Sequence, residues 1–215
     1  MDWSTYIWLI LLGSLMSALA YFKKGAPVFL RSLPIYLLIT FIIEFIGGWR
    51  NDQGKVTVTL YNVFTTIEFV FYFWLLHHMV KNRFIRKLLL HSLWLYPLLV
   101  ILNKLFLQRG LQFHTITFSL GGFLIVMATI VYFLELFHFD KPVDLVREPS
   151  FWISSGLLFF YACTFPLYAL ANFFKDPSNI IIKNIASILA IVNILLYSSF
   201  IIAALCRIRT RKSLS

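Results

Sequence analysis

The sequence predicts an all-α membrane protein built as a bundle of seven transmembrane helices. Of its 215 residues, 60% are hydrophobic and 18% aromatic, and only 13% are charged. A soluble domain carries roughly 25% charged residues, so this composition does not suit a surface that faces water. An apolar bilayer core about 30 Å thick needs about 20 apolar residues for each helical span. Helices are the expected form, because an open sheet edge in hydrocarbon leaves backbone groups unpaired.

Seven apolar stretches of suitable length lie along the chain. They cover residues about 3–22, 33–49, 57–80, 88–107, 113–137, 151–174 and 184–206. Charged residues and helix breakers, such as Asp52 with Gly54, separate them. With spans of about 20 residues, roughly 75 residues remain for all loops and tails. We therefore expect residues 1–215 to form one transmembrane domain.

Basic residues are divided unequally between the two sides that alternating spans create. The first, third and fifth loops and the C-terminal tail together hold 13 Lys and Arg, and the opposite side holds 6. The positive-inside rule then places the N-terminus outside and the C-terminus inside. The net charge of +10 fits attraction to the anionic lipids of an inner leaflet, so no nucleic-acid partner is expected. We expect a multi-pass protein of a cell membrane, the inner membrane in a bacterium.

The third span carries the most informative polar residues. Tyr61, Thr65, Glu68 and Tyr72 recur at helical spacing and form one stripe, with Asn62 beside it. Glu68 lies about eleven residues from the outer end, which at about 1.5 Å per residue is near the bilayer centre. Polar side chains at that depth face the bundle interior or a water-filled cavity. Glu68 is therefore the strongest functional candidate.

Other spans carry comparable stripes. Tyr36, Thr40 and Glu44 share a face of the second span, with Glu44 in its outer half. His114 and Glu135 share a face of the fifth span, and Tyr161 and Tyr168 share a face of the sixth. Asn193 and Tyr197 share a face of the seventh span. The helical faces on which these polar residues lie predict a polar, aromatic-lined pocket bounded by spans two, three, five, six and seven. Its predicted ligand-binding residues are Glu44, Tyr61, Asn62, Thr65, Glu68, Tyr161, Tyr168, Asn193 and Tyr197.

Both carboxyl groups also have a purely structural interpretation, as interior hydrogen-bonding groups that join helices. The sequence does not decide between that role and contact with a ligand or an ion. No His pair at i, i+4 spacing and no HExxH motif occurs. Cys163 and Cys206 differ too much in depth for a disulfide. We expect no metal and no cofactor.

The sequence lacks the motifs of two known seven-helix families and shares a short motif with a third group. The plan resembles rhodopsin-like proteins, but the seventh span has no interior lysine, since Lys183 lies at its outer start. Seven-helix zinc hydrolases of the ceramidase and adiponectin-receptor type require an intramembrane Asp, which the spans lack. The segment from Tyr61 to Phe69 is similar to a motif in small uncharacterised bacterial seven-helix membrane proteins, a resemblance that implies no activity.

These observations favour a sensor or ligand-binding protein that holds a small amphipathic molecule and signals through a protein partner. A transporter or oligomeric pore is the alternative, with Glu44 and Glu68 as proton or cation stations, although no inverted repeat is apparent. An intramembrane lipid-modifying enzyme is a third possibility, with Glu68 and His91 as the acid and base. The absence of a catalytic constellation from the sequence favours a binding protein over an enzyme.

Overall fold

The computed structural model describes residues 3–21, 27–138, 145–171 and 180–212, and these residues form a bundle of seven α-helices. The helices are α1 (Trp3–Tyr21), α2 (Val28–Asp52), α3 (Val58–Met79), α4 (Arg83–Leu102), α5 (Thr115–Phe137), α6 (Pro149–Ala171) and α7 (Ile180–Lys212). A short π-helix, η1 (Asn103–Leu107), continues α4, and a 3-10 turn, η2 (Leu145–Arg147), precedes α6. The predicted all-α class is confirmed.

Six of the helices, α2 to α7, are long and apolar enough to cross a membrane. The chain is therefore a polytopic helical membrane protein. Large apolar side chains are exposed around the bundle, as suits a surface that faces lipid; Trp94 of α4 is 83% exposed. The membrane crossing by α1 and the orientation with the N-terminus outside remain predictions.

The helices extend beyond several of the predicted apolar spans. Helix α2 begins at Val28 instead of residue 33, and α4 begins at Arg83 instead of residue 88. Helix α7 continues to Lys212, past the predicted end at residue 206. A hydropathy window measures the apolar slab, whereas a helix continues into the interfacial region, where polar side chains are solvated. Residues 172–174 of the predicted sixth span lie outside the described residues.

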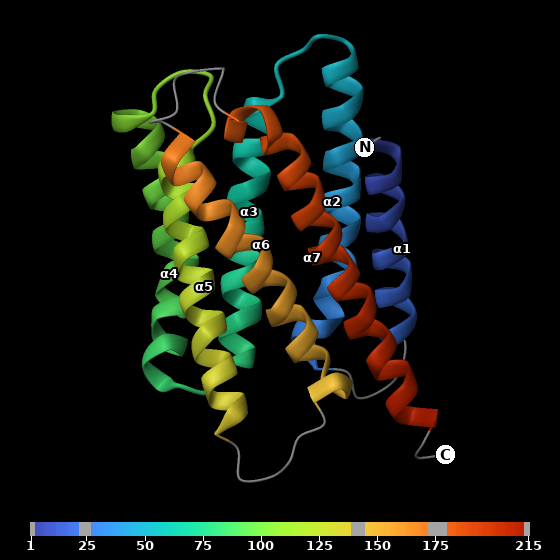
Figure 1. Ribbon diagram of the computed structural model, residues 1–215. Coiled ribbons are helices and arrows are strands. Elements are labelled where there is room, and N and C mark those ends of the chain that lie inside the picture. The colour runs from blue at the N-terminus through green and yellow to red at the C-terminus, as the bar shows by residue number, and fades with distance from the viewer. Residues whose placement is uncertain (1–2, 22–26, 139–144, 172–179, 213–215) are drawn as a thin grey trace.

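Figure 1 shows the helices running side by side, with their connections at two opposite faces. The upper face holds the end of α2, the start of α3 and the start of α7, and the lower face holds the end of α3 and the start of α4. Helix α1 packs between α2 and α7, α6 packs between α5 and α7, and α4 packs on α3. Helix α3 is the most buried of the six apolar helices.

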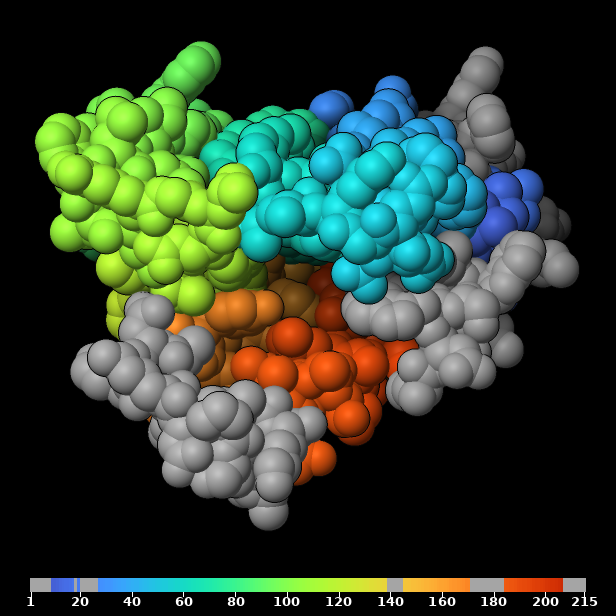
Figure 2. All heavy atoms as spheres, turned by 90° about the horizontal axis from the view of Figure 1, so that it is seen from above, coloured from blue at the N-terminus to red at the C-terminus, as the bar shows by residue number. Residues whose placement is uncertain are grey.

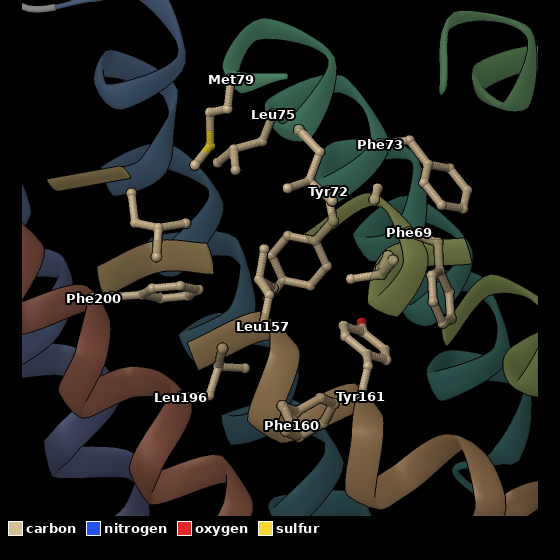
Figure 3. Packing of buried hydrophobic residues seen from close by; sticks show 14 of the residues in the cluster. Phe69, Tyr72, Phe73, Leu75, Met79, Leu157, Phe160, Tyr161, Leu196 and Phe200 are labelled. Atoms are coloured by element: carbon tan, nitrogen blue, oxygen red, sulfur yellow. The ribbon is translucent and has the colours of Figure 1, made fainter. Parts of the chain in front are cut away.

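A buried aromatic cluster occupies the centre of the bundle, and its members are Phe69, Tyr72, Phe73, Tyr96, Phe118 and Tyr161. The Phe69 ring lies 5.0 Å from the Tyr96 ring and 5.2 Å from the Tyr161 ring, measured between centroids. Gly121 permits this packing, because a Cβ there would lie 2.8 Å from Phe69 and 2.9 Å from Tyr96. Figure 3 shows Tyr72 and Tyr161 pointing toward one another within the cluster.

Candidate functional site

A cavity of about 500 Å³ lies between the helices above the buried aromatic cluster. Residues from α2, α3, α5, α6 and α7 line it, which are the five helices that the polar stripes predict. Its lining is Glu44, Thr57, Val58, Tyr61, Phe64, Thr65, Glu68, Phe113, Phe118, Phe160, Tyr168, Ala186, Ser187, Leu189, Ala190, Asn193, Ile194 and Tyr197. Figure 2, viewed from the upper face, shows the surface hollowed between α3 and the first turns of α7, with atoms of α6 visible deeper.

The cavity brings together most of the residues that the sequence predicts for the pocket. Those that line it are Glu44, Tyr61, Thr65, Glu68, Tyr168, Asn193 and Tyr197. Asn62 and Tyr161 are not in the lining. The helical faces predicted from the polar residues therefore do surround an interior cavity. Asn62 and Tyr161 lie outside its lining, among other residues.

Glu68 lies at mid-height in the bundle, as the eleventh of the 22 residues of α3, and is only 8% exposed. The Tyr36 hydroxyl donates to Glu68 Oε1 over 2.9 Å, and the Tyr36 and Tyr72 hydroxyl oxygens are 2.8 Å apart. Tyr36 has a single hydroxyl proton, so its donation to Glu68 leaves Tyr72 as the donor in the second bond. The two tyrosines form a short relay that ends on the carboxyl group at the base of the cavity.

Glu44 lies in the part of α2 nearer the upper face. The Tyr61 hydroxyl donates to Glu44 Oε2 over 3.2 Å. Gly47 makes room for this contact, because a Cβ there would lie 2.3 Å from the Tyr61 hydroxyl oxygen. The cavity thus carries one tyrosine-bonded carboxyl group near its upper end and another at its base.

Asn62 anchors the segment before α5. Its Nδ2 donates to the Gln112 carbonyl over 3.1 Å, and its Oδ1 accepts from the His114 backbone N–H over 3.2 Å. Its own carbonyl lies 3.1 Å from His114 Nε2. Asn62 therefore holds α3 to the start of α5, which is a structural role beside the cavity.

His114 precedes the first residue of α5 and is fully buried. Its Nδ1 lies 2.8 Å from Thr117 Oγ1. Burial lowers the pKa of the imidazole below its ordinary value of 6.5, and the charge on Lys104 acts in the same direction. His114 is therefore a structural residue that resists protonation.

Tyr161 is fully buried in the aromatic cluster beneath the cavity. Its ring lies 5.9 Å from the Tyr72 ring in an edge arrangement. Among the described residues, its hydroxyl has no hydrogen-bond partner. A buried hydroxyl without a partner carries a desolvation cost of about 1–3 kcal/mol, whereas the Tyr72 and Tyr96 hydroxyls of the same cluster are hydrogen-bonded.

The described lining has two carboxyl groups and contains no Lys, Arg or His. Two of the described cations near the upper face donate to backbone carbonyls of loops: Lys104 Nζ donates to the Gly110 and Gln112 carbonyls, and Arg50 Nη2 donates to the Val56 carbonyl. Within the described ranges no His, Cys, Asp or Glu cluster suits a metal ion. Cys163 is a free thiol, and the Cys206 thiol donates to the Val146 carbonyl over 3.1 Å.

His91 lies apart from the cavity. It is exposed on α4, where its Nδ1 is 2.6 Å from the Lys87 carbonyl, and it does not line the cavity that Glu68 lines. The structure therefore does not bring together the two residues on which an acid/base mechanism depends.

Some residues of the cavity have no counterpart in the predicted set. Phe113, Phe118 and Phe160 form much of its apolar wall. Tyr36 lies outside the wall but holds Glu68. Its spacing of eight residues from Glu44 places both on the same face of α2, and this signal is present in the sequence.

Fold and cavity together define the class: a polytopic helical membrane protein with an acidic, aromatic-lined interior cavity. Comparison with protein families, with characterised proteins and with solved structures finds no match. The cavity is therefore the feature of this protein that bears most directly on its function.

Proposed function

We propose that this protein binds a small amphipathic molecule in the cavity between α3 and α7 and signals its presence through a protein partner. The cavity is the observation that carries this proposal. Ligand sites in proteins are mostly apolar concavities of roughly 300–1,000 Å³ with a few convergent polar groups. A volume of about 500 Å³, an aromatic wall and two carboxyl groups fit that description.

Helix α7 offers a route from the cavity to the lower face. It contributes Ala186, Ala190, Asn193 and Tyr197 to the lining and continues as a helix to Lys212. A ligand between α3 and α7 binds more tightly to one spacing of these two helices than to another. Binding therefore shifts the equilibrium toward the conformation with the preferred spacing. We expect a partner to contact the lower end of α7.

The test uses the purified full chain in detergent and an organic extract of small molecules from the host membrane. A ligand at 100 times its Kd stabilises a protein by about 2.7 kcal/mol, so Tm rises by several degrees when the extract is added. E68Q replaces the carboxyl group at the cavity base with an amide and abolishes the rise. E148Q is the matched control, because Glu148 precedes α6 and does not line the cavity. An equal rise in Tm for wild type and E68Q would show that Glu68 does not bind the ligand.

A transporter is the second candidate, because Glu44 and Glu68 line one cavity at different heights. In the described structure, however, the fully buried side chains of Tyr72, Leu75 and Leu76 lie below Glu68 on α3. Transport requires this packing to open. Substrate flux in proteoliposomes that E68Q abolishes would favour a transporter over a sensor.

A further inference from the structure

We propose that the ligand of the cavity is a protonated amine attached to an apolar body. This inference rests on the proposed function, because it names the ligand class of the same cavity. Glu44 and Glu68 face the cavity, and the described lining contains no basic side chain. An ionised carboxylate removed from water needs a cation or several donors to offset its desolvation. Among the described residues, tyrosine hydroxyls donate to these carboxyl groups, Tyr61 to Glu44 and Tyr36 to Glu68.

The orientation of other polar groups agrees with a ligand that donates hydrogen bonds. Asn193 uses its Nδ2 to donate to the Leu189 carbonyl over 2.8 Å, which leaves its Oδ1 as an acceptor. Thr65 donates its hydroxyl proton to the Tyr61 carbonyl, which also leaves an acceptor. An ammonium group has three N–H donors and no acceptor, so it matches these oxygens. A carboxylate or phosphate ligand would face the same oxygens without donors.

The aromatic wall suits both parts of such a molecule. Seven of the described lining residues are aromatic: Tyr61, Phe64, Phe113, Phe118, Phe160, Tyr168 and Tyr197. The face of an aromatic ring attracts a cation electrostatically, and more strongly where water is excluded. The same rings and the aliphatic residues of α7 cover the apolar body. A cationic head near Glu68 and an apolar tail toward Phe113 and Ala186 use the whole cavity.

The experiment compares three probes of nearly equal shape: 4-phenylbutylamine, 4-phenylbutanol and 4-phenylbutyrate. Each is titrated calorimetrically into the full chain in nanodiscs of zwitterionic lipid, so that the bilayer does not itself attract the cation. The proteins are wild type, E68Q, the control E148Q, and A190L, which places a larger side chain in the cavity wall. If E68Q lacks a cooperative unfolding transition, E44Q replaces it.

We expect the amine to bind wild type and E148Q at least tenfold more tightly than the alcohol or the acid, and we expect E68Q to lose this preference. Equal binding of amine and alcohol, both weakened by A190L, would overturn the amine inference and leave the binding cavity in place. Failure of all three probes while extract-dependent stabilisation persists would overturn the amine inference alone. If the extract does not raise the Tm of the wild-type protein, the proposed function is overturned.

Discussion

The Tyr36 hydroxyl of α2 donates a hydrogen bond to Glu68 Oε1 of α3 over 2.9 Å, and this contact fixes the carboxyl group at the base of the cavity. The Tyr36 ring also stacks on Phe71, with centroids 4.2 Å apart. The ring position therefore has a support that is independent of the hydroxyl.

Tyr36→Phe removes the hydroxyl and keeps the stacked ring. Interior hydrogen bonds in helical membrane proteins contribute about 0.6–1.7 kcal/mol, and a buried acceptor left without its donor adds a cost. We expect the free energy of unfolding to fall by about 1–2 kcal/mol, measured by denaturant titration in detergent. In a cycle with Glu68→Leu, which has no acceptor, Y36F should cost less than in wild type, although the Tyr72 hydroxyl still loses its acceptor. Full additivity of the two changes would mean that the contact contributes nothing.

Adjacent glycines in α2 provide a matched pair. A Cβ at Gly47 would lie 2.3 Å from the Tyr61 hydroxyl oxygen, whereas a Cβ at Gly48 meets nothing within 4 Å. G48A should be neutral or stabilising by up to about 1 kcal/mol, because Ala favours a helix more than Gly does. In G47A the clash with Tyr61 should outweigh the helix propensity of Ala and displace Tyr61 from Glu44. We therefore expect G47A to lower both the free energy of unfolding and extract binding. Identical unfolding curves for the two variants would show that Tyr61 moves at no cost.

His114 predicts a pH dependence of stability. Its pKa in the folded chain is below the ordinary value of 6.5, chiefly because the imidazole is buried. Between the folded and unfolded pKa values the unfolded chain binds more protons, so stability rises with pH there and is lost as pH falls below about 6.5. The slope reaches at most about 1.4 kcal/mol per pH unit.

The measurement is the free energy of unfolding between pH 7.5 and 5 for wild type, H114Q and H138Q. We expect H114Q to be flatter than wild type, because it removes the buried titrating group. H138Q is the control, since His138 is exposed at the end of α5. Parallel curves for wild type and H114Q would show that another group controls the response.

The interior faces of the helices could be predicted because a polar residue in mid-membrane must face the interior, and helical spacing then fixes the phase of the whole stripe. Glu68, Thr65 and Tyr61 line the cavity on this basis. Asn62 is one residue away, and a rotation of about 100° per residue turns it toward the start of α5. Its partner Gln112 is 50 residues distant, and sequence spacing contains no information about such a contact.

The apolar wall could not be predicted for a different physical reason. The chain has 23 Phe residues, and lipid and protein interior are both apolar, so hydropathy does not separate Phe118 in the wall from the exposed Phe106. Helical spacing likewise does not identify the hydrogen-bond partners of a polar residue such as Glu135, which shares a predicted face with His114. Its carboxyl oxygens accept from the backbone N–H groups of Lys81 and Asn82 over 2.8 and 2.6 Å, before the first turn of α4.

The predicted orientation places the upper face, where the cavity surface is hollowed, outside the cell. Gln53 lies just after α2 at the upper face, and His138 lies just after α5 at the lower face. In a chain with Cys163 and Cys206 replaced by Ser, a membrane-impermeant thiol reagent should label Gln53→Cys in intact cells. It should label His138→Cys only after permeabilisation. The reverse pattern would place the C-terminus outside and contradict the charge asymmetry.

The most direct test of the central claim is native mass spectrometry of the full chain released from its own membrane, with wild type, G48A and A190L compared. Ala190 lines the cavity, and Gly48 faces open space. We predict that wild type and G48A carry one additional small molecule in a 1:1 ratio and that A190L carries none. An unliganded wild-type chain, or equal occupancy of all three proteins, would contradict a ligand-binding role for the cavity.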